Sequence, residues 1–166
     1  MAKLEVLPKR LEILDVNSSD CKFRINIDVL NEAFGIGRSM YAKAVYPDKK
    51  DTYILSDKPG DKFIIWMPKL YGNSSEWRNV LSEDGTELYE VAEPTRHEDW
   101  LGEGPRKNDI MRLVFVKDDP KSFYRFVGVF TGGKMEHLNH TFVRVASKVK
   151  LIGNPVTKIE LLYDNR

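Results

Sequence analysis

The chain has 166 residues, of which 42% are apolar and 31% are charged, a composition that excludes a disordered chain and allows one hydrophobic core. Its 26 basic and 25 acidic side chains give a net charge of +1, which lacks the basic excess of a strong nonspecific nucleic-acid binder but still allows a local basic face. The single cysteine, Cys21, excludes an internal disulfide and a cysteine-based zinc site.

Nothing in the sequence predicts a membrane protein or an exported protein. No stretch approaches the roughly 18 consecutive apolar residues of a membrane span, and Lys3 and Glu5 interrupt the start before an apolar signal core can form. We therefore expect a cytoplasmic protein with no membrane partner. The sequence shows no internal repeat and no linker, so residues 1–166 are expected to form a single domain.

The first third of the chain predicts two strands and one short helix. Strands are expected at residues 11–16 and 23–27, the second because apolar and polar residues alternate there. Over residues 29–34 the apolar spacing becomes helical, with Asp28 as the expected N-cap and Gly35 as the expected C-cap. Because Gly35 follows the helix instead of opening one, we interpret it as a helix exit and not as a dinucleotide-binding loop.

The middle third predicts a series of strands with a second helix among them. Strands are expected at residues 40–46, 53–55 and 63–67, and the last is apolar on both faces, which favours a central position in the sheet. A short helix is expected at residues 76–81, and another strand at residues 88–91.

The last third predicts three strands, at residues 113–116, 123–130 and 142–146. Each is short, bounded by turn residues and rich in β-branched or aromatic side chains. Long helices do not alternate with strands, which argues against a doubly wound fold. We therefore predict the α+β class, as a mixed, strongly curved β-sheet or β-barrel with two or three short peripheral helices.

Aromatic side chains give the first candidate for a binding site. In the run 123–130, Tyr124, Phe126 and Phe130 are expected to share a face with Gly128, and a glycine inside a strand often lets a ligand, or another backbone, approach closely. Rings of this kind could hold a flat base by stacking. The alternative is that most of them belong to the core.

Three tryptophans, Trp66, Trp77 and Trp100, could complete such a pocket. Trp100 lies beside Asp99 in the polar stretch 93–109, and a loop of that length inside a compact domain is usually functional or mobile. Basic side chains that could hold phosphate groups occur in the same loop and late in the chain. The alternative for them is a solvated charged face. These candidates for backbone contact are Arg96, Arg106, Lys107, Arg144 and Lys148.

Neither a metal site nor a catalytic centre is predicted. His137 and His140 are three residues apart, but the glycines and asparagine around them favour a hairpin loop with solvated histidines. His97 lies beside two carboxylates, yet adjacent residues seldom point at one substrate atom, and no nucleophile has a recognisable setting. We therefore predict no metal, no cofactor and no catalytic residue, and these observations argue against an enzyme.

Four stretches of the sequence resemble a known family. The runs FYRFVGVF (residues 123–130) and TFVRVAS (141–147) resemble the strand pair near the end of PUA-like domains, most of all the SRA-type and EVE-type modules of modification-dependent restriction systems. The runs DKFIIWMP (61–68) and EWRNVLSEDGTELYE (76–90) are similar to the middle of such modules. The resemblance extends over about residues 63–150.

The resemblance implies a curved β-barrel that flips one nucleotide into an aromatic pocket and reads the base by stacking and hydrogen bonds. It places Trp66, Tyr124 and Phe126 in the pocket lining, and Asp99 and Trp100 in a loop that could cover it. The sequence has no HNH nuclease motif, so cleavage would come from a partner or from a domain outside these residues. DNA is a more probable ligand than RNA on this view.

The function predicted on this basis is a nucleic-acid-binding module that reads a modified base without catalysis of its own. Two alternatives stay open. The first is a structural or protein-interaction β domain, and the second is an enzyme that acts on a small molecule or a nucleotide.

Overall fold

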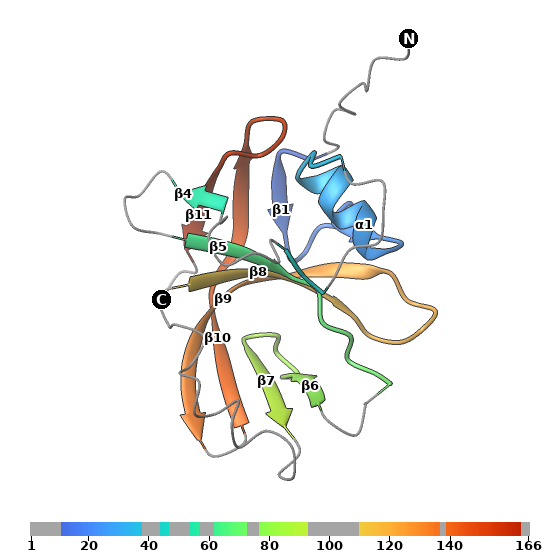
Figure 1. Ribbon diagram of the computed structural model, residues 1–166, viewed down its shortest axis with the longest axis vertical. Helices are drawn as coiled ribbons and strands as arrows, with labels where there is room; N and C mark the ends of the chain where they lie inside the picture. The colour runs from blue at the N-terminus through green and yellow to red at the C-terminus, as the bar shows by residue number, and fades with distance from the viewer. Residues whose placement is uncertain are drawn as a thin grey trace.

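The computed structural model describes residues 11–37, 44–46, 54–56, 62–72, 77–92, 110–136 and 139–163. Eleven strands of this described part form one mixed sheet (Figure 1). They are β1 (Ile13–Asp15), β2 (Lys22–Phe23), β3 (Val45–Tyr46), β4 (Ile54–Ser56), β5 (Lys62–Trp66), β6 (Trp77–Leu81), β7 (Glu87–Ala92), β8 (Ile110–Lys117), β9 (Tyr124–Glu136), β10 (Asn139–Ile152) and β11 (Lys158–Tyr163).

One short helical segment packs beside β1 (Figure 1). It consists of α1 (Asn26–Asp28) and the π-helical turn η1 (Val29–Ala33) that continues it. Gly35 ends the segment as expected, with a φ of +64° and its N–H donating to the Asn31 carbonyl at 3.1 Å. Asp28 occupies the expected N-cap position of η1, but its side chain makes no capping hydrogen bond, and the helical segment already begins at Asn26. The same early start limits the strand expected at residues 23–27 to β2.

The second predicted helix is a strand. Residues 76–81 were expected to be helical, but β6 pairs with β7 along its whole length. The turn between them explains the difference: the Asp84 carboxylate accepts hydrogen bonds from the Thr86 hydroxyl (2.7 Å), the Ser82 hydroxyl (2.8 Å) and the Thr86 N–H (3.1 Å). A turn held in this way brings its two flanking segments together as a hairpin. The prediction of two or three peripheral helices is therefore wrong for the described residues, which contain one.

The order of strands in the sheet is β2-β9-β8-β5-β4-β11-β10-β7-β6, with β1 added to β10, β3 added to β5 and a further pairing of β9 with β10. The central position expected for β5 is confirmed, since it pairs with β3, β4 and β8. The path ends in two edge strands, β2 and β6, so the sheet is not a simple closed barrel.

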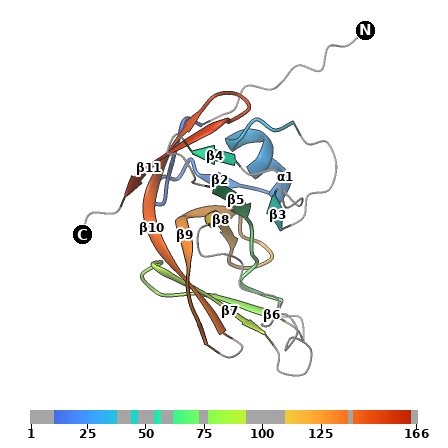
Figure 2. The same ribbon diagram turned by 60° about the vertical axis from the view of Figure 1, so that its left-hand side comes forward.

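The long strands β9 and β10 connect two halves of the molecule (Figures 1 and 2). The first part of β10 pairs with β7 and β9, and its second part pairs with β1 and β11. The half with β1, β4 and β11 also holds the helix, and the other half holds the β6–β7 hairpin. The strand β11 was not predicted from the sequence.

The strand β9 contains a bulge at Val127, next to Gly128, whose φ is +124°. The extra residue reverses the alternation of side chains, so that Phe126 and Phe130 belong to different apolar clusters. The prediction that Tyr124, Phe126 and Phe130 share one face is therefore wrong for Phe130.

Two apolar clusters result from this arrangement. The helix-side cluster packs the helix and β1 against the sheet and includes Leu14, Phe23, Leu30, Phe34, Phe63, Phe115, Tyr124, Phe126 and Ile159. The hairpin-side cluster packs the β6–β7 hairpin against β5, β8, β9 and β10. It consists of Trp66, Leu88, Val114, Val116, Val127, Phe130 and Phe142, with Val45, Leu70 and Leu81 beside it. None of the described helices has the length and apolarity of a membrane span.

Candidate functional site

Three polar or charged side chains of the described residues are buried, and all lie on strands that line the hairpin-side cluster. Glu90 of β7 is 6% exposed, Arg112 of β8 is 2% exposed and His140 of β10 is 0% exposed. Burying ionisable groups costs free energy, and such groups often mark a functional site when they occur together. We therefore build the candidate site around them.

A row of polar side chains runs across three neighbouring strands. The register places Asn79 of β6 opposite Glu90 of β7, and Glu90 opposite His140 of β10. Residues directly opposite each other in antiparallel strands point to the same face. Asn79, Glu90 and His140, called the polar row below, therefore face the same side of the sheet. The next row on that face is apolar and consists of Leu81, Leu88 and Phe142.

The ring of Phe142 is the centre of the contacts around the polar row. The His140 ring lies 4.0 Å from it, centroid to centroid, and the Trp66 ring lies 5.1 Å away. The Arg112 guanidinium lies 4.6 Å from the same centroid, and its Nη1 donates to the Ile110 carbonyl at 3.3 Å. A cation over an aromatic face is attracted by the ring quadrupole. This packing fixes Arg112 and His140 against one rigid surface.

One acceptor of the polar row is available for a donor from outside. The Asn79 Oδ1 atom is buried and finds no hydrogen-bond donor within the part of the chain that the structure describes. A buried polar atom without a partner costs free energy until a donor arrives. The Glu90 carboxylate, a second acceptor group, lies opposite Asn79 on the adjacent strand. This arrangement suits a ligand that presents a flat edge with N–H groups.

The aromatic residues predicted from the sequence do not all converge. Trp66 contributes to the hairpin-side cluster beside Phe142, whereas Tyr124 and Phe126 belong to the helix-side cluster, where the Phe126 ring lies 5.3 Å from that of Phe115. The backbone of Trp77 lies on β6, opposite Ala92. Asp99 and Trp100 lie outside the described residues.

The basic residues predicted to hold phosphates are separated in the same way. Arg96, Arg106 and Lys107 lie outside the described residues. Arg144 is partly buried, and its Nη1 donates to the Gly85 carbonyl in the β6–β7 turn at 3.5 Å. Its side chain also fills the space beside Gly128. Of the two alternatives for this glycine, the close approach of another backbone is the one observed, since a Cβ atom added at Gly128 would lie 2.8 Å from the Ala146 carbonyl oxygen, and the Arg144 stem fills the rest of the space.

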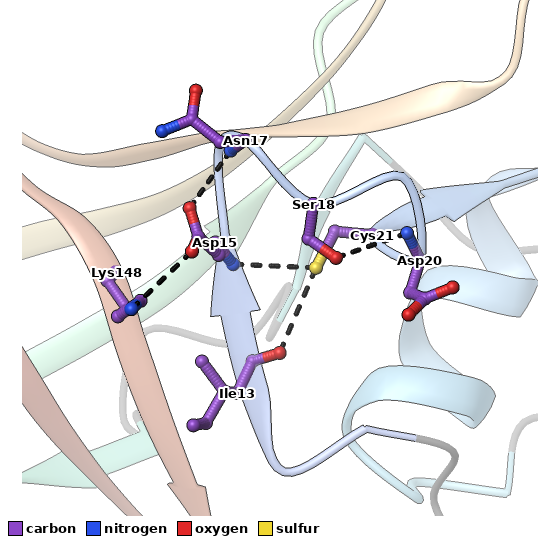
Figure 3. A network of polar contacts seen from close by, with 7 residues as sticks. All are labelled: Ile13, Asp15, Asn17, Ser18, Asp20, Cys21 and Lys148. Atoms are coloured by element: carbon purple, nitrogen blue, oxygen red, sulfur yellow. Dashed lines mark hydrogen bonds and ion pairs between the residues drawn. The ribbon is translucent and has the colours of Figure 1, made fainter.

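Lys148 forms part of a network at the start of the described chain (Figure 3). Its Nζ lies 3.6 Å from the Asp15 carboxylate, while the Asp15 N–H donates to the Cys21 sulfur at 3.4 Å. The Cys21 thiol in turn donates to the Ile13 carbonyl at 3.8 Å. The buried thiol thus holds the turn between β1 and β2, and Lys148 faces that turn at the end of β10 remote from the polar row.

The sequence interpretation missed the residues of the polar row, and also Arg112 and Phe142. His140 was expected in a solvated loop with His137, but it is fully buried on β10. His137 lies outside the described residues. One signal was available in the sequence. Glu90 lies two positions after Leu88 in a strand, so the two side chains share a face, and Leu88 is buried. Within the described part, no group of three or more histidine, cysteine or carboxylate side chains could hold a metal ion.

Comparisons with known proteins point to one family. The sequence model of the SET and RING associated domain matches residues 12–151. Among solved structures, the chain is similar to the 5-hydroxymethylcytosine-specific restriction enzyme AbaSI, with 26% sequence identity, a TM-score of 0.62 and coverage of 84% of this chain and 42% of that chain. It is also similar to the MspJI restriction endonuclease in complex with a 27-mer oligonucleotide, with 11% identity, a TM-score of 0.42 and coverage of 84% and 43%.

The chain thus spans less than half the length of these two solved proteins. A search among curated proteins found no match.

Proposed function

The chain belongs to the family of SET and RING associated (SRA) domains, and on this premise we propose that it binds DNA and recognises a modified base. The observation that carries the proposal is the family match, which covers residues 12–151. The likeness to a restriction enzyme specific for 5-hydroxymethylcytosine supports a modified cytosine as the base. The polar row and the rings beside it supply a chemistry that fits such a ligand.

The proposed mechanism starts with the base leaving the duplex, since base edges and faces are only partly accessible inside the stack. The Glu90 carboxylate accepts a hydrogen bond from the exocyclic amine of the cytosine, the pairing that carboxylates make with this base. Asn79 Oδ1 is the second acceptor on the same face. Phe142 and Trp66 form the apolar wall behind the polar row. Contributions from Trp77, Asp99, Trp100, Tyr124 and Phe126 stay a prediction from the sequence.

Recognition in this proposal breaks no bond. The chain spans 42% of the length of AbaSI, so cleavage would belong to a nuclease domain or subunit in addition to the residues described. The described residues bind the DNA, and the modification of the base determines the affinity. The partner class is therefore DNA together with a nuclease.

A binding panel tests the proposal directly. Duplexes of one sequence that carry cytosine, 5-methylcytosine, 5-hydroxymethylcytosine or its glucosylated form are titrated with the protein at fixed salt, and Kd is measured by mobility shift. We expect at least one modified duplex to bind more tightly than the plain one. Equal affinity for all four duplexes would reject the proposed function and favour a structural or protein-interaction domain.

A pair of variants on one strand tests the role of the polar row. Glu90→Gln should weaken binding to the modified duplex about tenfold, within the roughly 1–3 kcal/mol that a good side-chain contact to a base edge provides. The matched control is Glu87→Gln. Glu87 alternates with Leu88 on β7 and accepts a hydrogen bond from the Tyr89 hydroxyl, so it faces the opposite side of the hairpin. An equal loss of affinity for the modified duplex in both variants would contradict the assignment.

A further inference from the structure

Arg144 connects the β6–β7 hairpin to the long strands β9 and β10. Its backbone N–H donates to the Thr86 carbonyl at 2.9 Å, which continues the pairing of β7 with β10 into the turn. Its Nη1 donates to the Gly85 carbonyl of the same turn at 3.5 Å. Hydrogen bonds from Thr86 and Ser82 lower the pKa of the Asp84 carboxyl, and the Arg144 charge adds to this effect. Arg144 thus contacts the turn through both its backbone and its side chain.

The strand β9 packs against the stem of the Arg144 side chain. Arg144 lies directly opposite Phe130, and a Cβ atom added at Gly128 would lie 2.5 Å from Arg144 Cδ and 2.9 Å from its Cγ. The stem therefore occupies the space that a side chain at Gly128 would need. A long side chain that is packed along its stem has less freedom to lose when its charged end forms a contact. The Arg144 side chain thus bridges the β9 backbone and the turn of the hairpin.

Arg144 lies on the face of the sheet that carries the candidate site. Side chains two positions apart in a strand share a face, so His140, Phe142 and Arg144 project to the same side of β10. The register places Glu90 opposite His140 and Leu88 opposite Phe142, and Arg144 is the next residue of β10 on that face. The polar row and the Arg144 contacts are therefore separated by one apolar row of the same hairpin.

The position of the hairpin matters most for β6. Among the described residues β6 pairs only with β7, so the strand that carries Asn79 joins the sheet through β7. A two-stranded hairpin is marginally stable by itself and depends on packing for a fixed position. Acceptors that read a base edge have to be held within about 0.5 Å of the productive geometry. A contact that fixes the turn therefore also helps to fix Asn79 and Glu90.

We propose that Arg144 is a positioning residue for the polar row, which holds the β6–β7 hairpin so that Asn79 and Glu90 meet the base. The inference rests on the proposed function. It differs from the role predicted from the sequence, in which Arg144 holds a phosphate group of the DNA. The two roles have different consequences, because a phosphate contact contributes to the binding of every duplex, whereas the hairpin contributes only where a base is read.

Binding titrations of Arg144→Met over about 50 to 200 mM salt distinguish the two roles, since a lost phosphate contact would lower the slope of log K against log salt by about 0.9. For the duplex that binds most tightly in the panel, Kd should rise about fivefold, less than the roughly tenfold expected for Glu90→Gln. The salt slope should not change, and neither should Kd for a duplex of A·T pairs alone, in which no cytosine can be read.

Arg78→Met is the matched control. It removes the same charge from an exposed position on β6 that faces away from Asn79, its neighbour in the strand. This variant should bind both duplexes as the wild type does. An equal rise in Kd for Arg144→Met and Arg78→Met would overturn the positioning role.

A double-mutant cycle tests whether Arg144 acts through the polar row. In the Glu90→Gln background, Arg144→Met should raise Kd only about twofold, since one of the contacts that it positions is already lost. Circular dichroism at the assay temperature should show the variants folded. Arg144→Gln, which is too short to reach the Gly85 carbonyl, should give the same pattern of binding.

The outcomes separate this inference from the proposed function. Additive losses in the cycle, a lower salt slope or weaker binding of the A·T duplex would overturn the positioning role and leave the preference of the wild type for modified DNA intact. A wild type that binds every duplex of the panel equally would reject the proposed function, and the positioning role with it.

Discussion

Gly128 is a residue of β9 that lies close to the backbone of β10. A Cβ atom added there would lie 2.5 Å from Arg144 Cδ and 2.8 Å from the Ala146 carbonyl oxygen. The arginine stem could rotate away, but the carbonyl belongs to the backbone of β10 and cannot. The φ of +124° is also a conformation that other residues rarely adopt. The close approach of the two strands therefore depends on glycine at this position.

Gly128→Ala is accordingly expected to lower the free energy of unfolding by about 3 kcal/mol, from backbone strain and overpacking together. Urea denaturation followed by circular dichroism measures the change. Gly37→Ala is the matched control, since Gly37 also has a positive φ (+74°) but nothing within 4 Å of an added Cβ. It should cost about 1 kcal/mol. Equal losses in the two variants would show that the contact with β10 does not matter.

At the scale of elements, the β6–β7 hairpin carries two members of the polar row, and its turn is held by Asp84. Hydrogen bonds from the Thr86 hydroxyl, the Thr86 N–H and the Ser82 hydroxyl, with a smaller effect of the Arg144 charge, lower the pKa of the Asp84 carboxyl from 3.8 to about 2. Because the folded pKa lies below the unfolded one, ionised Asp84 stabilises the fold above about pH 4. That stabilisation is lost as the pH falls from 3.8 towards 2.

Asp84→Asn should therefore lower Tm at pH 7, and the gap between wild type and variant should close as the pH falls from about 4 to 2. Thermal melts at a series of pH values measure the gap. Glu83→Gln removes a neighbouring negative charge without changing the hydrogen bonds of the turn, so its Tm difference should not follow this course. A gap for Asp84→Asn that stays constant down to pH 2 would mean that the carboxylate does not hold the turn.

The elements also show what the sequence could and could not predict. The strands β5, β8 and β9 were found because β-branched and aromatic residues form runs between turn residues. The strand β6 was taken for a helix because Trp77, Val80 and Leu81 are spaced three and four apart, which fits a helical face as well as a strand. Pairing with β7 decides between the two, and pairing over a turn is not visible in the spacing of one segment.

The candidate site was predictable only in part for a related reason. Trp66 was predicted because the family resemblance placed it in the pocket lining, and its ring lies beside that of Phe142. The polar row was missed because Asn79, Glu90 and His140 come together through the register of three strands. The bulge at Val127 likewise places Phe130 on the other face of the sheet from Phe126. No particular residue type marks a bulge, so the sequence did not reveal it. The family, by contrast, was predicted from the resemblance of short strand motifs, and the SRA type is confirmed.

At the scale of the whole molecule, the two apolar clusters share β9 and β10. Phe115 and Phe130, both fully buried, lie in the helix-side and the hairpin-side cluster respectively. Because the same two strands contribute to both clusters, we expect the halves to unfold together as one domain.

Phe115→Leu and Phe130→Leu should therefore each lower the free energy of unfolding by about 1–2 kcal/mol within a single transition. Urea titrations monitored by tryptophan fluorescence and by far-ultraviolet circular dichroism should give coincident curves for the wild type and for both variants. Separate midpoints for the two probes in either variant would show that the halves are independent domains.

The strand β10 has 14 residues, which corresponds to a contour length of about 45 Å. His140 of the polar row lies near its beginning, and Lys150 pairs with β1 and β11 near its end. The strand thus joins the proposed reading site to the opposite end of the protein, with a register shift between Ala146 and Lys148. A partner that docked on β1 or β11 would therefore contact the same strand that carries His140.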